Sequence, residues 1–173
     1  FGGVFVFDGT DDGFSLSNIP QVFSGSVTFE GWFYFDALSG FDKTIVGKVG
    51  CNIGLVQAGS AMRMQVFGPG TPCASGNFSG IASTSITLST WQHWIGTYEV
   101  GVGVKVYRDG TLSATTSYTG NIGNYADTLF VGGSINTSYT MDGRIAVARV
   151  YKKTLSASEV LQNFNSQKSR FGL

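Results

Sequence analysis

Apolar and polar residues alternate along most of this chain, with the period of two that is typical of β-strands with one buried face. In the run Val27–Phe35, phenylalanines share one face, whereas polar and amphipathic side chains share the other. The strands predicted by such runs are Val4–Asp8, Val27–Phe35, Thr44–Lys48, Asn52–Gln57, Met62–Phe67, Ser85–Leu88, Trp91–Val100, Val104–Arg108, Leu112–Tyr118, Thr128–Gly132 and Arg144–Tyr151. Short strands separated by Gly, Asn, Ser or Pro indicate an all-β sandwich or barrel.

Two turns and one helix complete the pattern. Asp109-Gly110 separates two alternating runs and predicts a hairpin, because a type I′ turn needs positive φ at both central residues. A second hairpin is predicted with its turn at Ala58–Ser60. Near the end of the chain, Ser156 and Glu159 form a capping box ahead of an apolar stripe, which predicts a single short helix.

The composition fits one globular domain over residues 1–173, since no repeat or linker interrupts the pattern. Charged residues make up only 13%, about half the usual share, and 11 basic residues balance 11 acidic ones. This balance provides no electrostatic footprint for nucleic acid or for an anionic membrane. No apolar run reaches the roughly 20 residues of a spanning helix, so membrane insertion is not expected either.

The start at Phe1 falls inside a strand-like run and shows neither an initiating Met nor a signal peptide. We therefore expect the domain to be the C-terminal part of a longer polypeptide, and a processed product is the alternative.

The two cysteines, Cys51 and Cys73, flank the hairpin whose turn is predicted at Ala58–Ser60. The returning strand brings Cys51 near Phe67–Gly68, so a disulfide is geometrically allowed. It would contribute about 3 kcal/mol on the chain-entropy model. The alternative is a pair of free thiols in an intracellular assembly product, and the sequence leaves both open.

Four blocks follow one another along the chain: Phe7–Phe14, Val27–Trp32, Trp91–Gly110 and Val131–Val160. Together they resemble, in the same order, the laminin-G-like domains of the concanavalin A-like jelly-roll superfamily. The resemblance spans nearly the whole chain. It implies a two-sheet antiparallel jelly-roll sandwich, in agreement with the strand pattern.

The closing sequence NFNSQKSRFGL resembles the ends of such modules in tailed-phage structural proteins, particularly those of marine phages. This resemblance implies a location on the virion surface or outside the cell. It also implies other virion proteins as partners and a homotrimer as one candidate assembly.

The acidic residues do not predict an enzyme. Glycoside hydrolases of this superfamily need two carboxylates about 5 to 9.5 Å apart. None of the three glutamates, Glu30, Glu99 and Glu159, has another acid two or three residues away. The sole histidine, His93, lies in the family's Trp-x-His block, which indicates a residue packed in a strand. Hydrolase activity is kept only as a remote alternative.

The family resemblance also implies one Ca²⁺, held by aspartates and backbone carbonyls. If the first strand pairs antiparallel with the last, Asp11, Asp12 and Asp142 lie at the same end of the sandwich. However, Ala146 and Val147 stand where the family frequently has an acidic pair. Ordinary aspartate turns are the alternative interpretation.

Glycan binding needs exposed aromatic rings with amide or hydroxyl neighbours, because sugars stack on rings and form hydrogen bonds at their rims. The loop residues that fit are Tyr125, Tyr139, Asn124, Asn136 and Asn77. The sequence thus predicts a non-catalytic adhesion module on a virion, binding a glycan or receptor at a host surface. The alternative is a purely structural decoration or knob that contacts other proteins.

Overall fold

The computed structural model describes residues 3–17, 25–48, 53–69, 80–123, 128–133 and 139–173. Its strands and helices are β1 (Phe5–Asp8), β2 (Phe14–Leu16), β3 (Val27–Ala37), β4 (Lys43–Lys48), β5 (Ile53–Ala58), β6 (Ala61–Val66), β7 (Gly80–Ser85), β8 (Trp91–Glu99), β9 (Gly103–Arg108), β10 (Thr111–Ser117), β11 (Leu129–Val131), β12 (Asp142–Tyr151), α1 (Ala157–Gln167) and the 3₁₀ helix η1 (Lys168–Phe171).

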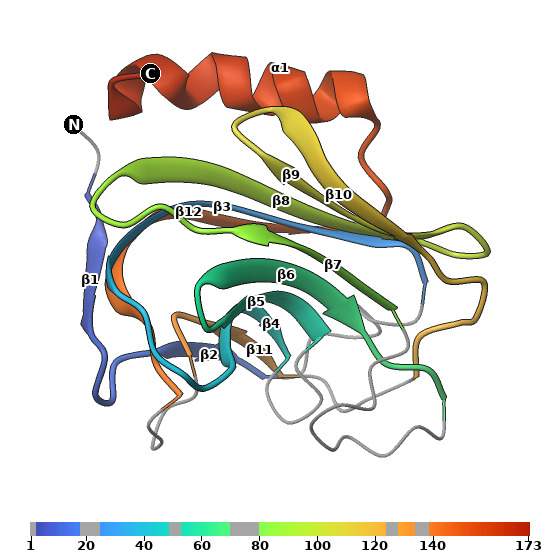
Figure 1. The fold of residues 1–173 in the computed structure, drawn as a ribbon, viewed down its shortest axis with the longest axis horizontal. Helices are drawn as coiled ribbons and strands as arrows, with labels where there is room; N and C mark the ends of the chain where they lie inside the picture. The colour runs from blue at the N-terminus through green and yellow to red at the C-terminus, as the bar shows by residue number, and fades with distance from the viewer. Residues whose placement is uncertain (1–2, 18–24, 49–52, 70–79, 124–127, 134–138) are drawn as a thin grey trace.

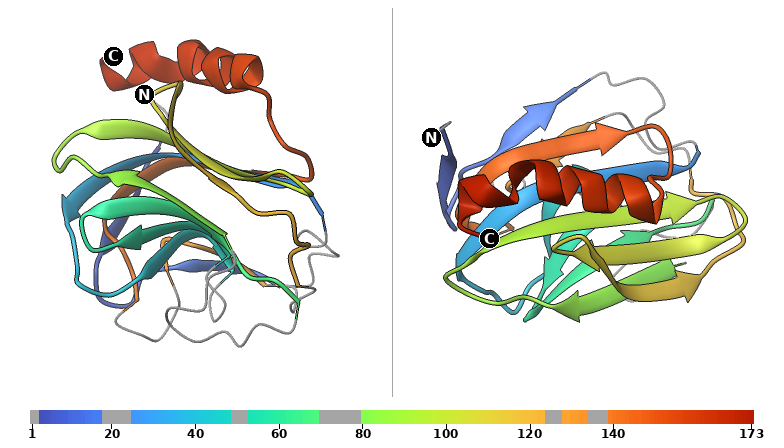
Figure 2. Two further views of the ribbon diagram at one scale, coloured as in Figure 1. Left: turned by 45° about the vertical axis from the view of Figure 1, so that its right-hand side comes forward. Right: turned by 90° about the horizontal axis from the view of Figure 1, so that it is seen from above.

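The strands form two antiparallel sheets that pack face to face (Figure 1). Sheet A has six strands in the order β1-β12-β3-β8-β9-β10, and sheet B has six in the order β2-β11-β4-β5-β6-β7. Helix α1 lies across the outer face of sheet A, as the two further views in Figure 2 show. The predicted all-β sandwich with one C-terminal helix is therefore confirmed.

Each side of the sandwich ends in one edge strand from each sheet. On one side β1 lies next to β2, where the rings of Phe5 and Phe14 are in contact. On the other side β10 lies next to β7, and the Thr116 hydroxyl donates to the Ile81 carbonyl. The second side is thus closed by contacts between the sheets.

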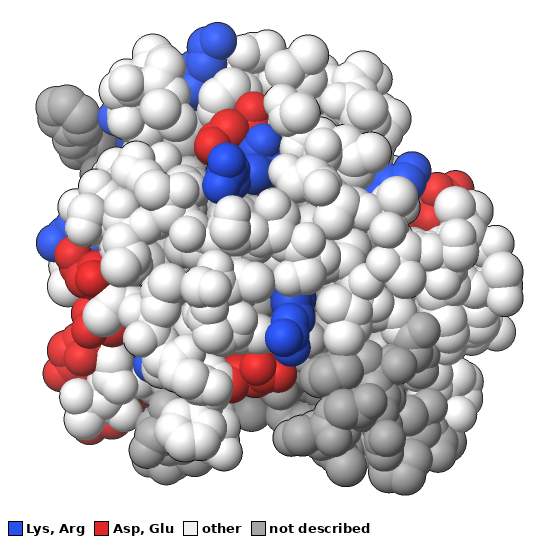
Figure 3. Space-filling model, viewed as in Figure 1, with Lys and Arg blue, Asp and Glu red and all other residues white. Residues whose placement is uncertain are grey.

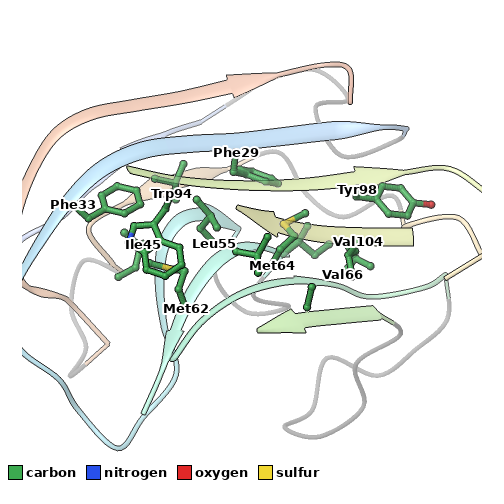
Figure 4. Close-up of a cluster of buried hydrophobic side chains, with 14 of the residues drawn as sticks. Phe29, Phe33, Ile45, Leu55, Met62, Met64, Val66, Trp94, Tyr98 and Val104 are labelled. Carbon is green, nitrogen blue, oxygen red and sulfur yellow. The ribbon is translucent and has the colours of Figure 1, made fainter. Parts of the chain in front are cut away.

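The core fills the space between the two sheets (Figure 4). Side chains from both inner faces are fully buried, in the alternation that the sequence predicts. The largest of them are Phe29, Phe33, Phe35, Trp94 and Tyr98 from sheet A and Ile45, Ile53, Leu55, Met62 and Met64 from sheet B.

Helix α1 begins as predicted. The Ser156 side chain accepts from the Glu159 N–H, and the Glu159 carboxylate accepts from the Ser156 N–H at 2.8 Å. Val160 is buried against Ile95 and Tyr107 on the outer face of sheet A. The capping box therefore sets the start of the helix, and a second apolar cluster holds the helix on the sheet.

The prediction of a strand at Ser85–Leu88 is wrong. The strand in this region is β7, which ends at Ser85, and the Ile86 N–H donates instead to the Ser60 carbonyl at 2.9 Å. The sequence of β7 carries small and hydroxyl side chains, so it lacks the alternation of large apolar residues that marks the other strands. The strand β2 is missed for a different reason: it has only three residues, all exposed, which is too short for a period of two to stand out.

Candidate functional site

One end of the sandwich brings together the candidate residues that the structure describes. Strand β1 pairs antiparallel with β12 in a register that places Asp8 opposite Asp142. The turn between β1 and β2, which carries Asp11 and Asp12, therefore lies beside the start of β12, as predicted. Tyr139 precedes β12 at this same end. We call residues 8–13, 38–43 and 139–142, together with Arg63, the acidic end.

Two exposed aromatic rings lie together at the acidic end. The ring centroids of Phe41 and Tyr139 are 6.4 Å apart in an edge-to-face arrangement, and 65% and 46% of these residues are exposed. The loop that carries Phe41 is fixed by Gln57, whose amide donates to the carbonyls of Ser39 and Gly59 at 3.0 and 2.6 Å. Tyr139 was a sequence candidate, but Phe41 was not.

Charged side chains border the two rings. Arg63 forms an ion pair with Asp42 at 3.5 Å, and both side chains are partly exposed. Burial lowers the pKa of Lys43, and the nearby Asp142 carboxylate opposes that shift. Asp42 follows Phe41 directly in the chain, so the partly exposed Asp42–Arg63 pair places charged groups of both signs next to one of the exposed rings, whereas Lys43 is buried. Figure 3 shows acidic side chains gathered on the side of the molecule that carries β1.

The aspartates of the β1–β2 turn are engaged with the backbone. The Asp12 carboxylate accepts from the Asp8 N–H at 3.1 Å, and the Asp8 carboxylate accepts from the Thr10 N–H at 2.8 Å. Within the described residues, no group of three or more His, Cys, Asp and Glu side chains is arranged to hold a metal ion. Calcium at Asp11, Asp12 and Asp142 therefore stays a prediction, and it requires further oxygen ligands.

The remaining sequence candidates cannot be placed in this site. The glycan candidates Tyr125, Asn124, Asn136 and Asn77, and the cysteines Cys51 and Cys73, lie outside the described residues.

A second cluster of charged groups lies between sheet A and helix α1. Glu30 is fully buried, and its carboxylate lies 3.1 Å from Nε2 of His93. It also accepts from Arg149 at 2.8 Å, from the Tyr151 hydroxyl at 2.6 Å and from the Asn163 amide of α1 at 2.9 Å. The carboxylate thus joins β3, β8 and β12 to the helix.

The same contacts shift two pKa values. Burial raises the pKa of Glu30, but the hydrogen bonds from His93 and Tyr151 and the electrostatic attraction of His93 and Arg149 together outweigh burial and hold that pKa below its usual value. Burial and the Glu30 carboxylate raise the pKa of Tyr151 to about 12. Because Glu30 and His93 are both buried, as predicted for His93, the cluster is suited to holding the helix rather than to contacting a ligand.

Solved structures share this fold at low sequence identity. The receptor-binding domain of a botulinum neurotoxin mosaic serotype C/D superposes with a TM-score of 0.73 and 15% identity, over 96% of this chain and 45% of that chain. Domain 4 of an extracellular GH43 arabinanase from Geobacillus stearothermophilus, in complex with arabinotriose, superposes with a TM-score of 0.61 and 19% identity. This match covers 91% of this chain and 74% of that chain. A Trypanosoma rangeli sialidase superposes with a TM-score of 0.65 and 18% identity, over 94% of this chain and 27% of that chain. At these identities the likeness shows the fold alone.

Sequence comparison is more specific. Residues 8–161 match Laminin_G_3, the family described as the concanavalin A-like lectin/glucanases superfamily. No curated protein matches the sequence. In the part of the chain that the structure describes, no helix has the length and apolar character needed to cross a membrane.

Proposed function

Because the chain belongs to the concanavalin A-like lectin/glucanases superfamily, we propose that it is a non-catalytic, surface-exposed module that recognises glycans at its acidic end. The observation that carries this proposal is the pair of exposed rings, Phe41 and Tyr139, bordered by charged hydrogen-bonding groups. Sugars stack their C–H faces on such rings and bind at the rim through hydroxyls. The arabinanase domain solved with arabinotriose is a protein of this fold that is named with a bound sugar.

The charge of the acidic end favours a neutral glycan. Its carboxylates outnumber its cations: the carboxylates are Asp8, Asp11, Asp12, Asp42 and Asp142, and the cations are Lys43 and Arg63. A sugar that carries a carboxylate or sulfate would meet repulsion from this excess. We therefore propose a neutral host-surface saccharide as the ligand class.

The binding test removes one ring at a time. We expect Tyr139→Ala and Phe41→Ala each to weaken glycan affinity about tenfold, which is about 1.4 kcal/mol, because each deletes a stacking surface. A glycan array identifies the ligand and isothermal titration measures the affinity. Leu112→Ala is the control, since Leu112 is 48% exposed on β10, far from the site along sheet A. Silence across the array, or unchanged affinity in both ring variants, would contradict the proposal. Cleavage of the glycan during titration would contradict its non-catalytic part.

The setting we propose is the surface of a virion, where the module binds a host receptor or glycan. Support for this setting comes from the resemblance of the C-terminal sequence to phage structural proteins. The second candidate function is a structural decoration or knob that contacts other virion proteins. The exposed apolar side chains of β1 and β2 favour that candidate, because such patches mark protein interfaces.

Calcium binding at Asp11, Asp12 and Asp142 remains part of the proposal, with backbone carbonyls as the further ligands. An ion that binds the folded chain raises its stability, so a tenfold excess of Ca²⁺ over Kd should raise Tm by about 3 to 6 °C. Differential scanning fluorimetry with and without EDTA measures the shift. Asp12→Asn should remove it, whereas Asp36→Asn, which breaks only the ion pair with Arg144, should keep it. An identical Tm with Ca²⁺ and with EDTA would overturn the calcium site.

A further inference from the structure

The two exposed rings of the acidic end are held in place in different ways. The residue after Tyr139 pairs with Gly133 in a β-bridge, and the N–H of the next residue donates to the Gly132 carbonyl at 2.8 Å. Phe41 lies in the loop between β3 and β4, and no backbone hydrogen bond joins residues 38–42 to another part of the chain that the structure describes. The position of the Phe41 ring therefore depends on side-chain contacts.

A short series of hydrogen bonds connects the Phe41 backbone to β5. Gln57 of β5 is only 1% exposed, and its amide donates to the carbonyls of Ser39 and Gly59 at 3.0 and 2.6 Å. The Ser39 hydroxyl in turn donates to the Phe41 carbonyl at 3.1 Å. Gln57 thus joins the loop that carries Phe41 to the turn between β5 and β6. Because the amide is buried, these bonds face little competition from water.

The other contacts of this loop do not replace the Gln57 amide. Leu38 packs against the core, but it lies before Ser39 and leaves the rest of the loop unattached. Asp42 pairs with Arg63 at 3.5 Å, and both side chains are partly exposed. Exposed ion pairs contribute little to order, because water and salt screen them. The buried amide is therefore the main restraint on the loop.

We propose that Gln57 is a positioning residue of the glycan site, which holds the Phe41 ring beside Tyr139 before a saccharide binds. This inference rests on the proposed function. Because its side chain is buried, Gln57 acts through the loop and not by touching the sugar. Binding to a loop that is already ordered avoids the entropic cost of fixing its backbone and its ring. Removing Gln57 therefore weakens binding although both rings remain present.

Two substitutions remove the restraint in different ways. Gln57→Met keeps the length of the side chain but has no donor, and Gln57→Asn keeps the donors but is too short to reach both carbonyls. In both variants the nuclear Overhauser effect between the Phe41 and Tyr139 rings should weaken, and the Phe41 amide should exchange at least tenfold faster. Affinity for the neutral saccharide with the highest signal on the glycan array should fall at least tenfold in isothermal titration.

Gln92→Met is the matched control. Gln92 is also buried, at 3% exposed, and its amide oxygen accepts from the Thr87 N–H at 3.3 Å. It therefore holds a different loop, which carries neither ring. Saturation with the same saccharide gives a second control, because binding should order the loop again and restore the ring-to-ring Overhauser effect in the Gln57 variants. A general loss of structure would not be reversed in this way.

The outcomes separate this role from the proposed function. A released loop, weaker binding, recovery at saturation and unchanged affinity in Gln92→Met support it. An unchanged Overhauser effect in both Gln57 variants overturns it without any saccharide. So does a loss of amide protection throughout sheet B, which would make the role of Gln57 purely structural. A released loop with unchanged affinity overturns its contribution to binding. Silence of the unmodified chain on the array overturns the proposed function, and the role in binding with it.

Discussion

Replacing Glu30 with glutamine is expected to lower the free energy of unfolding by about 3 kcal/mol, the low end of the range for breaking a buried ion pair. The amide keeps the shape of the side chain, but its NH₂ group faces donors, and Arg149 loses its carboxylate. Because the Arg149 side chain is 41% exposed, water restores part of its hydration, which is why we expect the low end. In a domain of this size the loss corresponds to a Tm lower by about 6 to 12 °C.

The control for Glu30→Gln is the same substitution at Glu99, a partly exposed residue at the end of β8. Its effect should stay within about 0.5 kcal/mol, as for other surface changes. Hydrogen exchange adds a local test, since Asn163 ties α1 to Glu30. In Glu30→Gln the amides of α1 should exchange faster, relative to those of β5, than in the unmodified chain. A variant with unchanged Tm and unchanged exchange in α1 would refute the role of this carboxylate.

The Glu30 contribution should also depend on pH in a defined direction. Its pKa in the folded chain lies below the ordinary value of 4.5, so folding is stabilised above that value. The stabilisation is lost as the pH falls through the folded pKa. Tyr151 behaves in the opposite sense, because its pKa is raised from 10.0 to about 12. Its contribution is full below pH 10 and is lost as the pH rises toward 12. The difference in the free energy of unfolding between the unmodified chain and Glu30→Gln should therefore be largest near neutral pH and become smaller in acid.

The cluster around Glu30 shows where sequence interpretation ends. The period of two places Glu30 and Trp32 on one face of β3, and it places His93 on one face of its own strand. Their contact, however, depends on the register that pairs Trp32 with His93 and Arg149 with Glu30. These pairings join segments far apart in the chain. A pattern within one strand carries no information about its partner's register.

At the acidic end, one part of the site could be predicted from the sequence and another part could not. That Asp11, Asp12 and Asp142 share one end follows from a single antiparallel pairing, that of β1 with β12, and the prediction holds. Phe41 was missed because it is a lone aromatic in a loop, where no periodicity distinguishes an exposed ring from a buried one. Only its position beside Tyr139 in the folded chain identifies it.

Gly31→Ala is expected to destabilise the fold by about 3 kcal/mol, at the upper end for overpacking a core. A Cβ at this position of β3 would lie 2.1 Å from Cζ of Phe33 and 2.8 Å from the Val147 carbonyl oxygen. Phe33 is fully buried and packs edge to face on Phe35, so its ring has no free space to enter. The carbonyl belongs to the backbone of β12 and moves only with the sheet. Urea unfolding measures the loss.

Two comparisons isolate the physical cause of this loss. Gly40→Ala is the matched control, because a Cβ there meets nothing within 4 Å, and its effect should stay within about 0.5 kcal/mol. Phe33→Leu shortens the side chain that occupies the space in front of Gly31. If the ring is the obstacle, Gly31→Ala costs about 1 kcal/mol less in the Phe33→Leu background than in the unmodified chain. Strict additivity of the two substitutions would instead place the obstacle at the Val147 carbonyl, and the glycine would then be required by strand pairing rather than by the phenylalanine core.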